Sequence, residues 1–320
     1  MGRDSVSVFA PATVANVASG FDVLGFALER PGDTVVLRKT KEKRVAILAV
    51  EGDDGRLPRD PDKNTASVAA RHFLEEIGFP FGLEVTLRKQ MPMSSGLGSS
   101  AASSVAAVYA ANVLAGNPYT VRELLPFTMK AEEVACGSAH ADNVAPALLG
   151  GFVLIRSYDP LDVVQLPVPS PLVVAIVHPH TEIKTEDARR ILKKELRLSD
   201  AVRQWGNLAA LVAALYEGDL ELLSRSLQDV VAEPRRGLLI PGFAKVKEAA
   251  IENGALGCSI SGSGPSLFSL CASMEKAQNV GTAMQQAFAE VGLDSDIYLS
   301  QINETGPVIL EGQSQERGGR

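Results

Sequence analysis

The feature that most constrains this chain is a glycine- and serine-rich segment, PMSSGLGSSAAS, at residues 92–103. It follows GLEVTLRKQ (82–90), whose alternating apolar residues predict a strand, and it leads into SAASSVAAVYAANVLAG (100–116), which predicts a helix of small residues. A glycine-rich turn at a helix start directs backbone N–H groups one way, and the helix dipole adds positive charge there. The segment is therefore predicted to cradle a phosphate chain.

The spacing of residues in this segment alone leaves other interpretations open. It is not a Walker A motif, because no Lys-Ser/Thr pair opens the helix. Gly96, Gly98 and Ala101 match the G-x-G-x-x-A turn of dinucleotide-binding proteins, but that fold needs an acidic residue about 20 positions later, where this chain has LAGNPYT (114–120). A purely structural turn is the other alternative.

Two further polar segments are candidates for chemistry. EEVACGSAHADN (132–143) brings carboxylates, an imidazole and an amide into one short stretch, and Glu132 or Glu133 with a loop serine could hold Mg²⁺ on nucleotide phosphates. The alternative is a solvated helix face followed by a capping turn. SISGSGPSLFSL (259–270) predicts a tight turn between two short strands, which on spacing alone indicates only a hairpin.

Length and composition narrow the class of protein. The 320 residues suggest two domains or one large one. The net charge is −7 with lysine and arginine scattered, which argues against a nucleic-acid surface. No apolar run approaches the ~20 residues that cross a bilayer, so we expect no membrane partner and a cytoplasmic enzyme. The oligomeric state is left open, with a homodimer as one outcome.

The remaining chain alternates between strand and helix signals. Strands are expected at 5–10, 34–40, 44–50 and 150–157, and helices at 65–77, 121–135 and through 185–231. The proline-bearing stretch 159–172 is the best candidate boundary, so we place a division near residue 160. The polar tail at 311–320 is expected to be disordered.

Taken together, three segments resemble, in order and spacing, the signature motifs of the small-molecule kinase superfamily that includes galactokinase, homoserine kinase, mevalonate kinase and phosphomevalonate kinase, the GHMP kinases. These are FAPATVANVASGFDVLGFAL (9–28), the loop at 92–102 and SISGSGPS (259–266). Within it, the homoserine kinase family is most similar, through HADNVAPALLGGF (140–152), TEDAR (185–189) and EPRRGLLIPGF (233–243). One departure is Ala18-Ser19, where that family often has Gly-Pro.

The resemblance implies a two-domain α+β fold. An N-terminal ribosomal-S5-like α/β domain (1–160) would bind ATP, and a C-terminal ferredoxin-like α/β sandwich (161–310) would complete the enzyme. The implied reaction transfers the ATP γ-phosphate to the side-chain hydroxyl of L-homoserine, a step towards threonine, with Mg²⁺ as cofactor. Alternatives are a related kinase for a mevalonate-like or sugar substrate, and a non-catalytic ligand sensor of the same fold.

Site residues are carried over from the family position by position. The phosphate loop would comprise Pro92, Met93, Ser94, Ser95, Gly96, Leu97, Gly98, Ser99, Ser100 and Ala101, with Lys89 adding charge and Asn64 near the nucleotide base. Ser100 and Glu132 match the Mg²⁺ ligands. The substrate pocket would contain Asn16, Asp22, His140, Arg189, Arg236 and Gly262. Asn143 stands where mevalonate kinase has a catalytic aspartate; an amide cannot act as a base, but phosphoryl transfer depends mainly on positioning and charge neutralisation.

Overall fold

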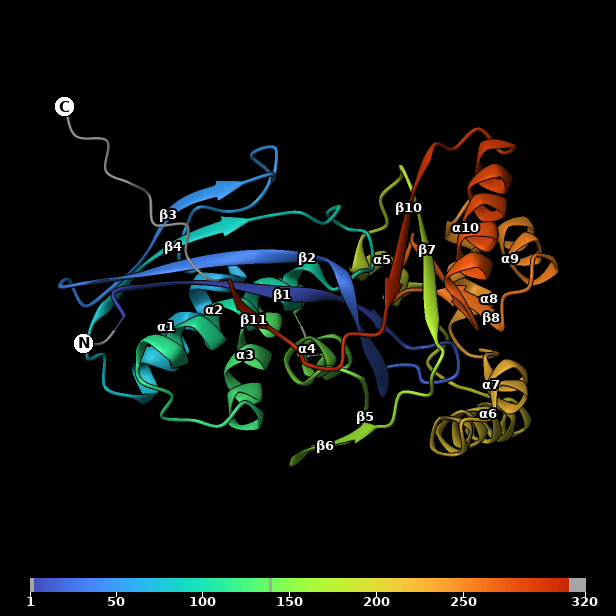
Figure 1. Ribbon diagram of the computed structural model, residues 1–320, viewed down its shortest axis with the longest axis horizontal. Helices are drawn as coiled ribbons and strands as arrows, with labels where there is room; N and C mark the ends of the chain where they lie inside the picture. Colours follow the sequence, from blue (N-terminus) through green and yellow to red (C-terminus); the bar gives the residue numbers. More distant parts are fainter. Residues whose placement is uncertain (1–2, 138–139, 311–320) are drawn as a thin grey trace.

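The computed structural model describes residues 3–137 and 140–310, apart from the side chains of residues 134–136. The tail predicted to be disordered, 311–320, lies outside the described residues. The chain forms two β-sheets, and helices pack on each of them (Figure 1).

The first sheet has seven strands and is built mainly by the N-terminal half. Its order is β11 (Val308–Leu310), β1 (Ser5–Ala15), β2 (Leu24–Thr40), β4 (Gly82–Arg88) and β3 (Val45–Glu51), with β5 (Phe152–Tyr158) and β6 (Leu161–Leu166) attached at the start of β2. Only β3 and β4 pair in parallel. The two long strands β1 and β2 carry the sheet towards the second half of the molecule (Figure 1).

Helices cover one face of this sheet (Figure 1). They are α1 (Thr65–Glu76), α2 (Ser99–Leu114), α3 (Leu125–Cys136), which follows the short 3-10 helix at Arg122–Leu124, and α4 (Ala141–Leu149). Helix α2 is central, since it contacts β1, β2 and all three other helices. Its alanine and serine residues permit this close approach, and 12 of its 16 residues are buried. The predicted helix at 100–116 is thereby confirmed.

The second sheet has four antiparallel strands, in the order β10 (Ser295–Gln301), β7 (Val173–Pro179), β9 (Leu267–Cys271) and β8 (Gly257–Ile260). Helices α9 (Phe243–Glu252) and α10 (Met274–Ala289) pack on one face. Residues of β7 alternate between that layer and the core shared with the first sheet. Burial on both faces explains why VVAIV (173–177) is apolar without interruption.

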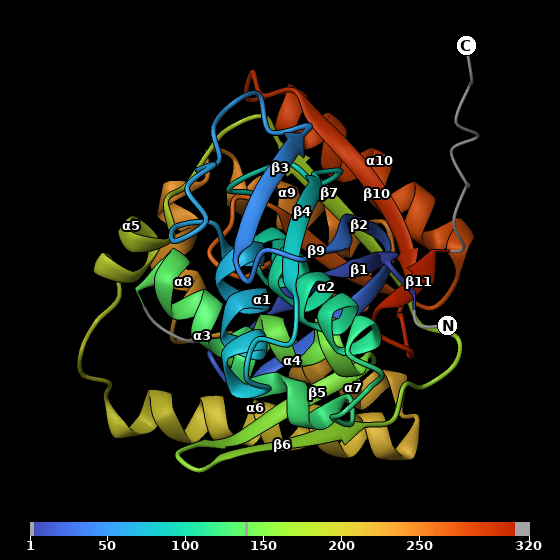
Figure 2. The ribbon, with the colours of Figure 1, turned by 90° about the vertical axis from the view of Figure 1, so that its left-hand side faces the viewer.

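Four short or peripheral helices complete the structure between β7 and β8. They are α5 (Thr185–Arg190), α6 (Leu198–Glu217), α7 (Leu220–Ser226) and α8 (Glu233–Arg236), with a 3-10 turn at Gly237–Leu239. Helix α6 runs along one edge of the molecule, beside β6 (Figure 2). In the described ranges, no helix is long and apolar enough to cross a membrane.

The α+β class with two sheets is confirmed, with differences at the sheet edges. The strand expected at 5–10 extends to residue 15, and β11, which sequence patterning missed, returns to pair with β1. The first sheet also continues past residue 160, because β6 pairs with β5. The division at 160 stays a prediction, and sheet membership favours placing it in the proline-bearing stretch after β6.

Candidate active site

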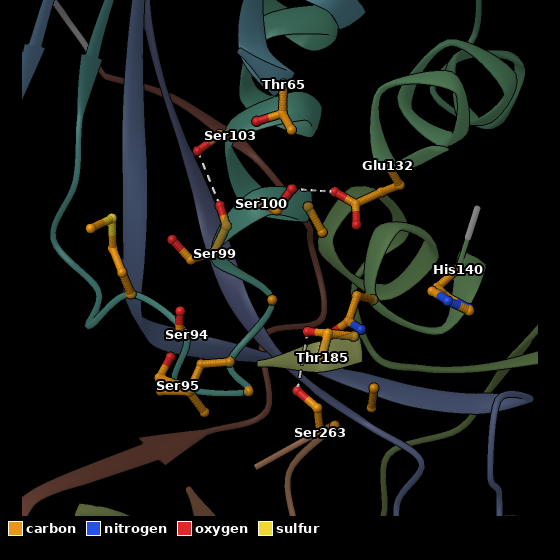
Figure 3. A pocket seen from close by; sticks show the side chains of 18 of the residues that line it. Thr65, Ser94, Ser95, Ser99, Ser100, Ser103, Glu132, His140, Thr185 and Ser263 are labelled. Carbon is orange, nitrogen blue, oxygen red and sulfur yellow. Dashed lines mark hydrogen bonds between the residues drawn. The ribbon is translucent and has the colours of Figure 1, made fainter. Parts of the chain in front are cut away.

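A cavity of about 630 Å³ opens where the two sheets meet. Its lining comes from the end of β1, the loop before α2, helices α3, α4, α5 and α8, and the turn between β8 and β9. Figure 3 shows polar side chains from several of these elements facing a common space. Every predicted site residue lines this cavity except Pro92.

The glycine-rich loop places the first turn of α2 at the cavity. Gly98 is the N-cap residue in a left-handed conformation, with φ of 66°, and a glycine offers no side chain to cap the helix. Ser99, Ser100 and Ala101 follow directly and line the cavity. A helix start without a side-chain cap, facing a cavity, is suited to binding an anion through backbone N–H groups.

The same glycines also meet a steric requirement of the protein itself. A Cβ atom on Gly98 would lie 2.1 Å from the Thr13 hydroxyl oxygen, and one on Gly96 would lie 2.3 Å from the Ser261 carbonyl oxygen. The Ser261 hydroxyl donates to the Gly96 carbonyl at 2.8 Å. The loop and the β8–β9 turn are therefore packed together. The turn does not only connect two strands, because it also holds the loop before α2 in place. The loop therefore has a structural function in this fold, and the binding of an anion by the loop stays a prediction.

Ser100 and Glu132 lie next to each other at the end of the cavity where α2 begins. The Ser100 hydroxyl donates to the Glu132 carboxylate at 2.7 Å (Figure 3). Glu132 is buried, whereas Glu133 is exposed and forms an ion pair with Lys130. Of the two glutamates left open by the sequence, Glu132 is therefore the one that faces the cavity.

Lys89, which is predicted to add charge beside the loop, has its own charged partner in the structure. Its ammonium group forms a buried ion pair with Asp33 and donates to the Ser99 carbonyl at 3.1 Å and the Ser103 hydroxyl at 2.9 Å. Burial lowers the pKa of Lys89, and Asp33 opposes that shift. Lys89 lines the cavity, but these contacts favour a role in fixing the start of α2.

Asn64 likewise has a local function that its sequence context did not reveal. Its side-chain oxygen accepts from the Ala66 N–H at 3.1 Å, which caps α1, and its amide group donates to the Pro58 carbonyl at 3.1 Å. Asparagine immediately before a helix is a common cap. Asn64 thus shapes the part of the loop before α1 that lines the cavity.

At the other end of the cavity, charged side chains from distant segments form one cluster. Arg189 on α5 pairs with both carboxylate oxygens of Asp22, at 2.9 and 3.0 Å, and lies 3.0 Å from a ring nitrogen of His140. Burial, and after it the Arg189 charge, lowers the pKa of His140, which favours the neutral imidazole. The predicted substrate residues therefore do converge.

Arg236 and Asn16 join this cluster to the β8–β9 turn. The Gly262 carbonyl accepts from Arg236 at 2.7 Å and from the Asn16 amide at 2.9 Å. The Arg236 guanidinium also stacks over the Phe21 ring at 5.1 Å. Both side chains therefore hold the two sheets together as well as lining the cavity.

Asp142 is the main cavity residue that sequence reasoning left without a role. It is buried at the first turn of α4, and its Oδ1 atom has no hydrogen-bond partner among the described residues. Burial, with a smaller contribution from Asp22, raises its pKa to about 7. Its position two residues after His140 and one before Asn143 was the available signal.

Two other contributions were missed: one comes from a loop with no recognisable motif, and the other from a residue of the segment 9–28 to which no role was carried over. Arg56 and Lys63, in the loop between β3 and α1, line the cavity with positive charge, and Arg56 forms an ion pair with Glu182, which also lines the cavity. Thr13 on β1 donates to Asn143 at 2.8 Å and so fixes the orientation of that amide.

Comparisons with known proteins agree on one family. The GHMP kinases N terminal domain matches residues 64–151, and the GHMP kinases C terminal domain matches residues 211–290. The chain is 54% identical over 318 residues to homoserine kinase of Chlorobium phaeovibrioides, covering 96% of this chain and 99% of that one. It is 53% identical over 316 residues to homoserine kinase of Chloroherpeton thalassium, with 95% and 99% covered.

Solved structures extend the comparison to the whole fold. The crystal structure of homoserine kinase from Cytophaga hutchinsonii matches with a TM-score of 0.94 and 58% identity, covering 96% of this chain and 98% of that one. The L. major mevalonate kinase in complex with R-mevalonate matches with a TM-score of 0.71 at 15% identity, covering 94% and 99%. The second likeness concerns the fold alone.

Proposed function

Since the chain belongs to the homoserine kinase family of the GHMP kinases, we propose that its cavity binds ATP and L-homoserine and transfers the ATP γ-phosphate to the homoserine side-chain hydroxyl. The observation that carries this proposal is the two-ended cavity. One end has the open start of α2 and Ser100 with Glu132, and the other has Asp22, Arg189 and Arg236.

The nucleotide end fits a phosphate chain with Mg²⁺. Within residues 3–137 and 140–310, no three His, Cys, Asp or Glu side chains are grouped to hold a metal ion. One hydroxyl and one carboxylate are nevertheless what Mg²⁺ needs when nucleotide phosphates supply other ligands. Ser100 and Glu132 would hold the ion, which would neutralise phosphate charge during transfer.

The acceptor end fits an amino acid. Asp22 and Arg189 already neutralise each other, so a ligand with one charge would leave the second partner unpaired. A zwitterion can insert between them, with its ammonium group on Asp22 and its carboxylate on Arg189 and Arg236. Arginine is suited to this because its planar group donates two parallel hydrogen bonds to a carboxylate. Mevalonate and sugars lack the ammonium group.

Asn143 lines the cavity in the first turn of α4, beside Gly98 and three residues after His140. Its side-chain oxygen is engaged by Thr13, so its NH₂ group is the part that can donate to an acceptor hydroxyl or a phosphate oxygen. We therefore assign it a positioning function rather than that of a base. The product, a phosphorylated amino acid, would enter threonine biosynthesis, and the cytoplasm is the compartment we propose.

The test is ADP release with L-homoserine, mevalonate, galactose and L-threonine as acceptors, with the phosphorylated product identified by mass spectrometry. We expect activity with homoserine that depends on added Mg²⁺. Preferential use of mevalonate or galactose would establish one of the related kinases instead. Binding of homoserine and ATP without ADP release from any acceptor would establish the non-catalytic sensor.

A further inference from the structure

Gln204 is a polar residue on the buried side of α6, whose other buried residues are apolar. Its side-chain amide donates to the Ser19 carbonyl at 2.9 Å and to Asp229 Oδ1 at 3.1 Å. Its oxygen accepts from the Val230 N–H at 2.9 Å. Burying an amide is unfavourable unless its hydrogen bonds are made, and here both N–H groups and the oxygen have partners. Gln204 therefore joins three segments at one buried point.

The first partner, Ser19, lies in the turn between β1 and β2 that places Asn16 and Asp22 at the cavity. Four non-glycine residues of this turn, at 16, 17, 18 and 22, have φ between 42° and 71°. Residues other than glycine rarely adopt this conformation, so such a turn persists only where the surrounding structure holds it. The bond from Gln204 to the Ser19 carbonyl is one contact that does so, and it lies in the middle of the turn.

The second partner, Asp229, fixes helix α8, which places Arg236 at the cavity. The Asp229 carboxylate accepts from the backbone N–H groups of residues 231, 232 and 233, at 2.7 to 3.2 Å. Helix α8 has only four residues and would not be stable without such contacts. The Arg236 N–H donates to the Ala232 carbonyl at 2.9 Å, so the arginine lies one turn after the residues that Asp229 holds.

Gln204 thus connects the turn that carries Asp22 with the helix that carries Arg236, although it does not itself line the cavity. In the proposed function, Asp22 receives the ammonium group of homoserine and Arg236 receives its carboxylate. These two groups are a short, fixed distance apart in an amino acid, so their partners must keep a matching separation. We propose that Gln204 is a positioning residue that sets this separation, an inference that rests on the proposed function.

Loss of the Gln204 amide should weaken acceptor binding selectively. The Gly262 carbonyl still joins Asn16 to Arg236 inside the cavity, so the arrangement would loosen without collapsing. Asp22 and Arg236 would bind homoserine away from its reacting hydroxyl, and neither belongs to the phosphate loop. We therefore expect KM for homoserine to rise, while kcat and KM for ATP stay nearly constant.

The test compares Gln204→Met, which keeps the side-chain length but removes the amide, with Asn207→Met. Asn207 lies three residues later on α6 and donates to the Gln228 carbonyl at 3.0 Å. Its variant also loses a hydrogen bond to the segment before α8, but leaves the bonds to Ser19 and Asp229 in place. KM for homoserine should rise about tenfold in Gln204→Met, and the constants of Asn207→Met should stay within about twofold of wild type. An unchanged KM for homoserine in Gln204→Met, or equal increases in KM for homoserine and for ATP, overturns the proposal.

Gln204→Glu tests the two N–H groups themselves, because glutamate keeps the length and the oxygen facing Val230 but has no amide donor. This variant should raise KM for homoserine at least as much as Gln204→Met, and a wild-type KM would overturn the proposal. Melting temperatures and ATP binding show that each variant is folded.

Titration of homoserine into wild type and variants separates this inference from the proposed function. Wild type that binds homoserine without releasing ADP contradicts the function alone, and the same tenfold difference should then appear in Kd. Wild type that neither binds nor phosphorylates homoserine overturns both.

Discussion

At the scale of single residues, Glu132 is the carboxylate on which Mg²⁺-dependent transfer should depend. Glu132→Gln keeps the shape and removes the charge beside Ser100, so we expect kcat to fall by more than about a hundredfold, while homoserine binding persists. The matched variant is Glu133→Gln, because that neighbour is exposed and paired with Lys130. Steady-state rates at saturating Mg²⁺ decide this. Near-normal turnover of Glu132→Gln would remove it from the site.

Thr13 should act through Asn143. Thr13→Val removes the hydroxyl but keeps the side-chain volume, which leaves the Asn143 oxygen without its donor at 2.8 Å. We expect kcat to fall about tenfold with little change in KM for ATP, the size expected for one hydrogen bond, and Thr13→Ser to retain most activity. In an Asn143→Ala background, Thr13→Val should have no further effect on kcat. Additive losses would show that Thr13 acts by another route.

Lysine variants of Arg236 and Arg235 distinguish recognition of a carboxylate by a guanidinium group from the effect of positive charge alone. Arg236 is buried, donates to the Ala188 and Gly262 carbonyls and faces the cavity, while Arg235 is half-buried and is not among the cavity-lining residues. Arg236→Lys should lower kcat/KM for homoserine by about tenfold to a hundredfold, and Arg235→Lys should change it little. Equal losses in the two variants would contradict this assignment.

Asp142 should make stability depend on pH. Its pKa is raised from 3.8 to about 7 in the folded protein, so its contribution to stability is complete below about pH 3.8 and is lost as pH rises through 7. Asp142→Asn removes this dependence on pH, because an amide does not ionise. From pH 5.5 to pH 8.5 the free energy of unfolding of the variant should gain about 2 kcal/mol relative to wild type. Urea unfolding without ligands measures this, and a constant difference would argue against the raised pKa.

At the scale of elements, the glycines of the loop before α2 are needed for packing within the protein and are predicted to be needed for nucleotide binding. A sequence motif cannot distinguish these two reasons. Gly98 stands at a left-handed position and its Cα faces Thr13 and Asn143. Gly98→Val should abolish nucleotide binding, because a branched side chain would occupy the space where the backbone approaches a phosphate group. The contact of 2.1 Å with the Thr13 hydroxyl shows that some destabilisation must accompany it. A melting curve with and without ATP distinguishes the two effects, since a cradle that is intact would still be stabilised by nucleotide.

At the scale of the whole molecule, the last described segment of the chain forms the edge strand of the first sheet. Strand β11 pairs with β1, and the Gly151 N–H donates to the Asn303 carbonyl at 2.7 Å. A chain ending after Gly306 lacks β11 and leaves the β1 edge unpaired, so it should melt several degrees lower, since about 1 kcal/mol shifts Tm by a few degrees in chains of this size. A chain ending after Leu310 keeps β11 and is the control. Equal melting temperatures would show that β11 contributes nothing.

Much of the secondary structure and the phosphate-loop hypothesis could be predicted from short stretches of sequence. The periodicity of 65–77, 82–90 and 100–116 determined a helix, a strand and a helix, because burial of one face requires that spacing. The glycine loop indicated an anion site because backbone N–H groups and the helix dipole are local properties. Its three motifs together indicated the kinase family.

Only the tertiary structure decided which charges are available to a ligand. Lys89 is neutralised by Asp33, 56 residues away, and Asp22 by Arg189, 167 residues away. Glu132, rather than Glu133, turns inward because α3 packs against α2. Thr13 reaches Asn143 across 130 residues, and β11 returns to β1. Periodicity within one segment carries no information on such long-range pairs, because they form only when separate elements pack together.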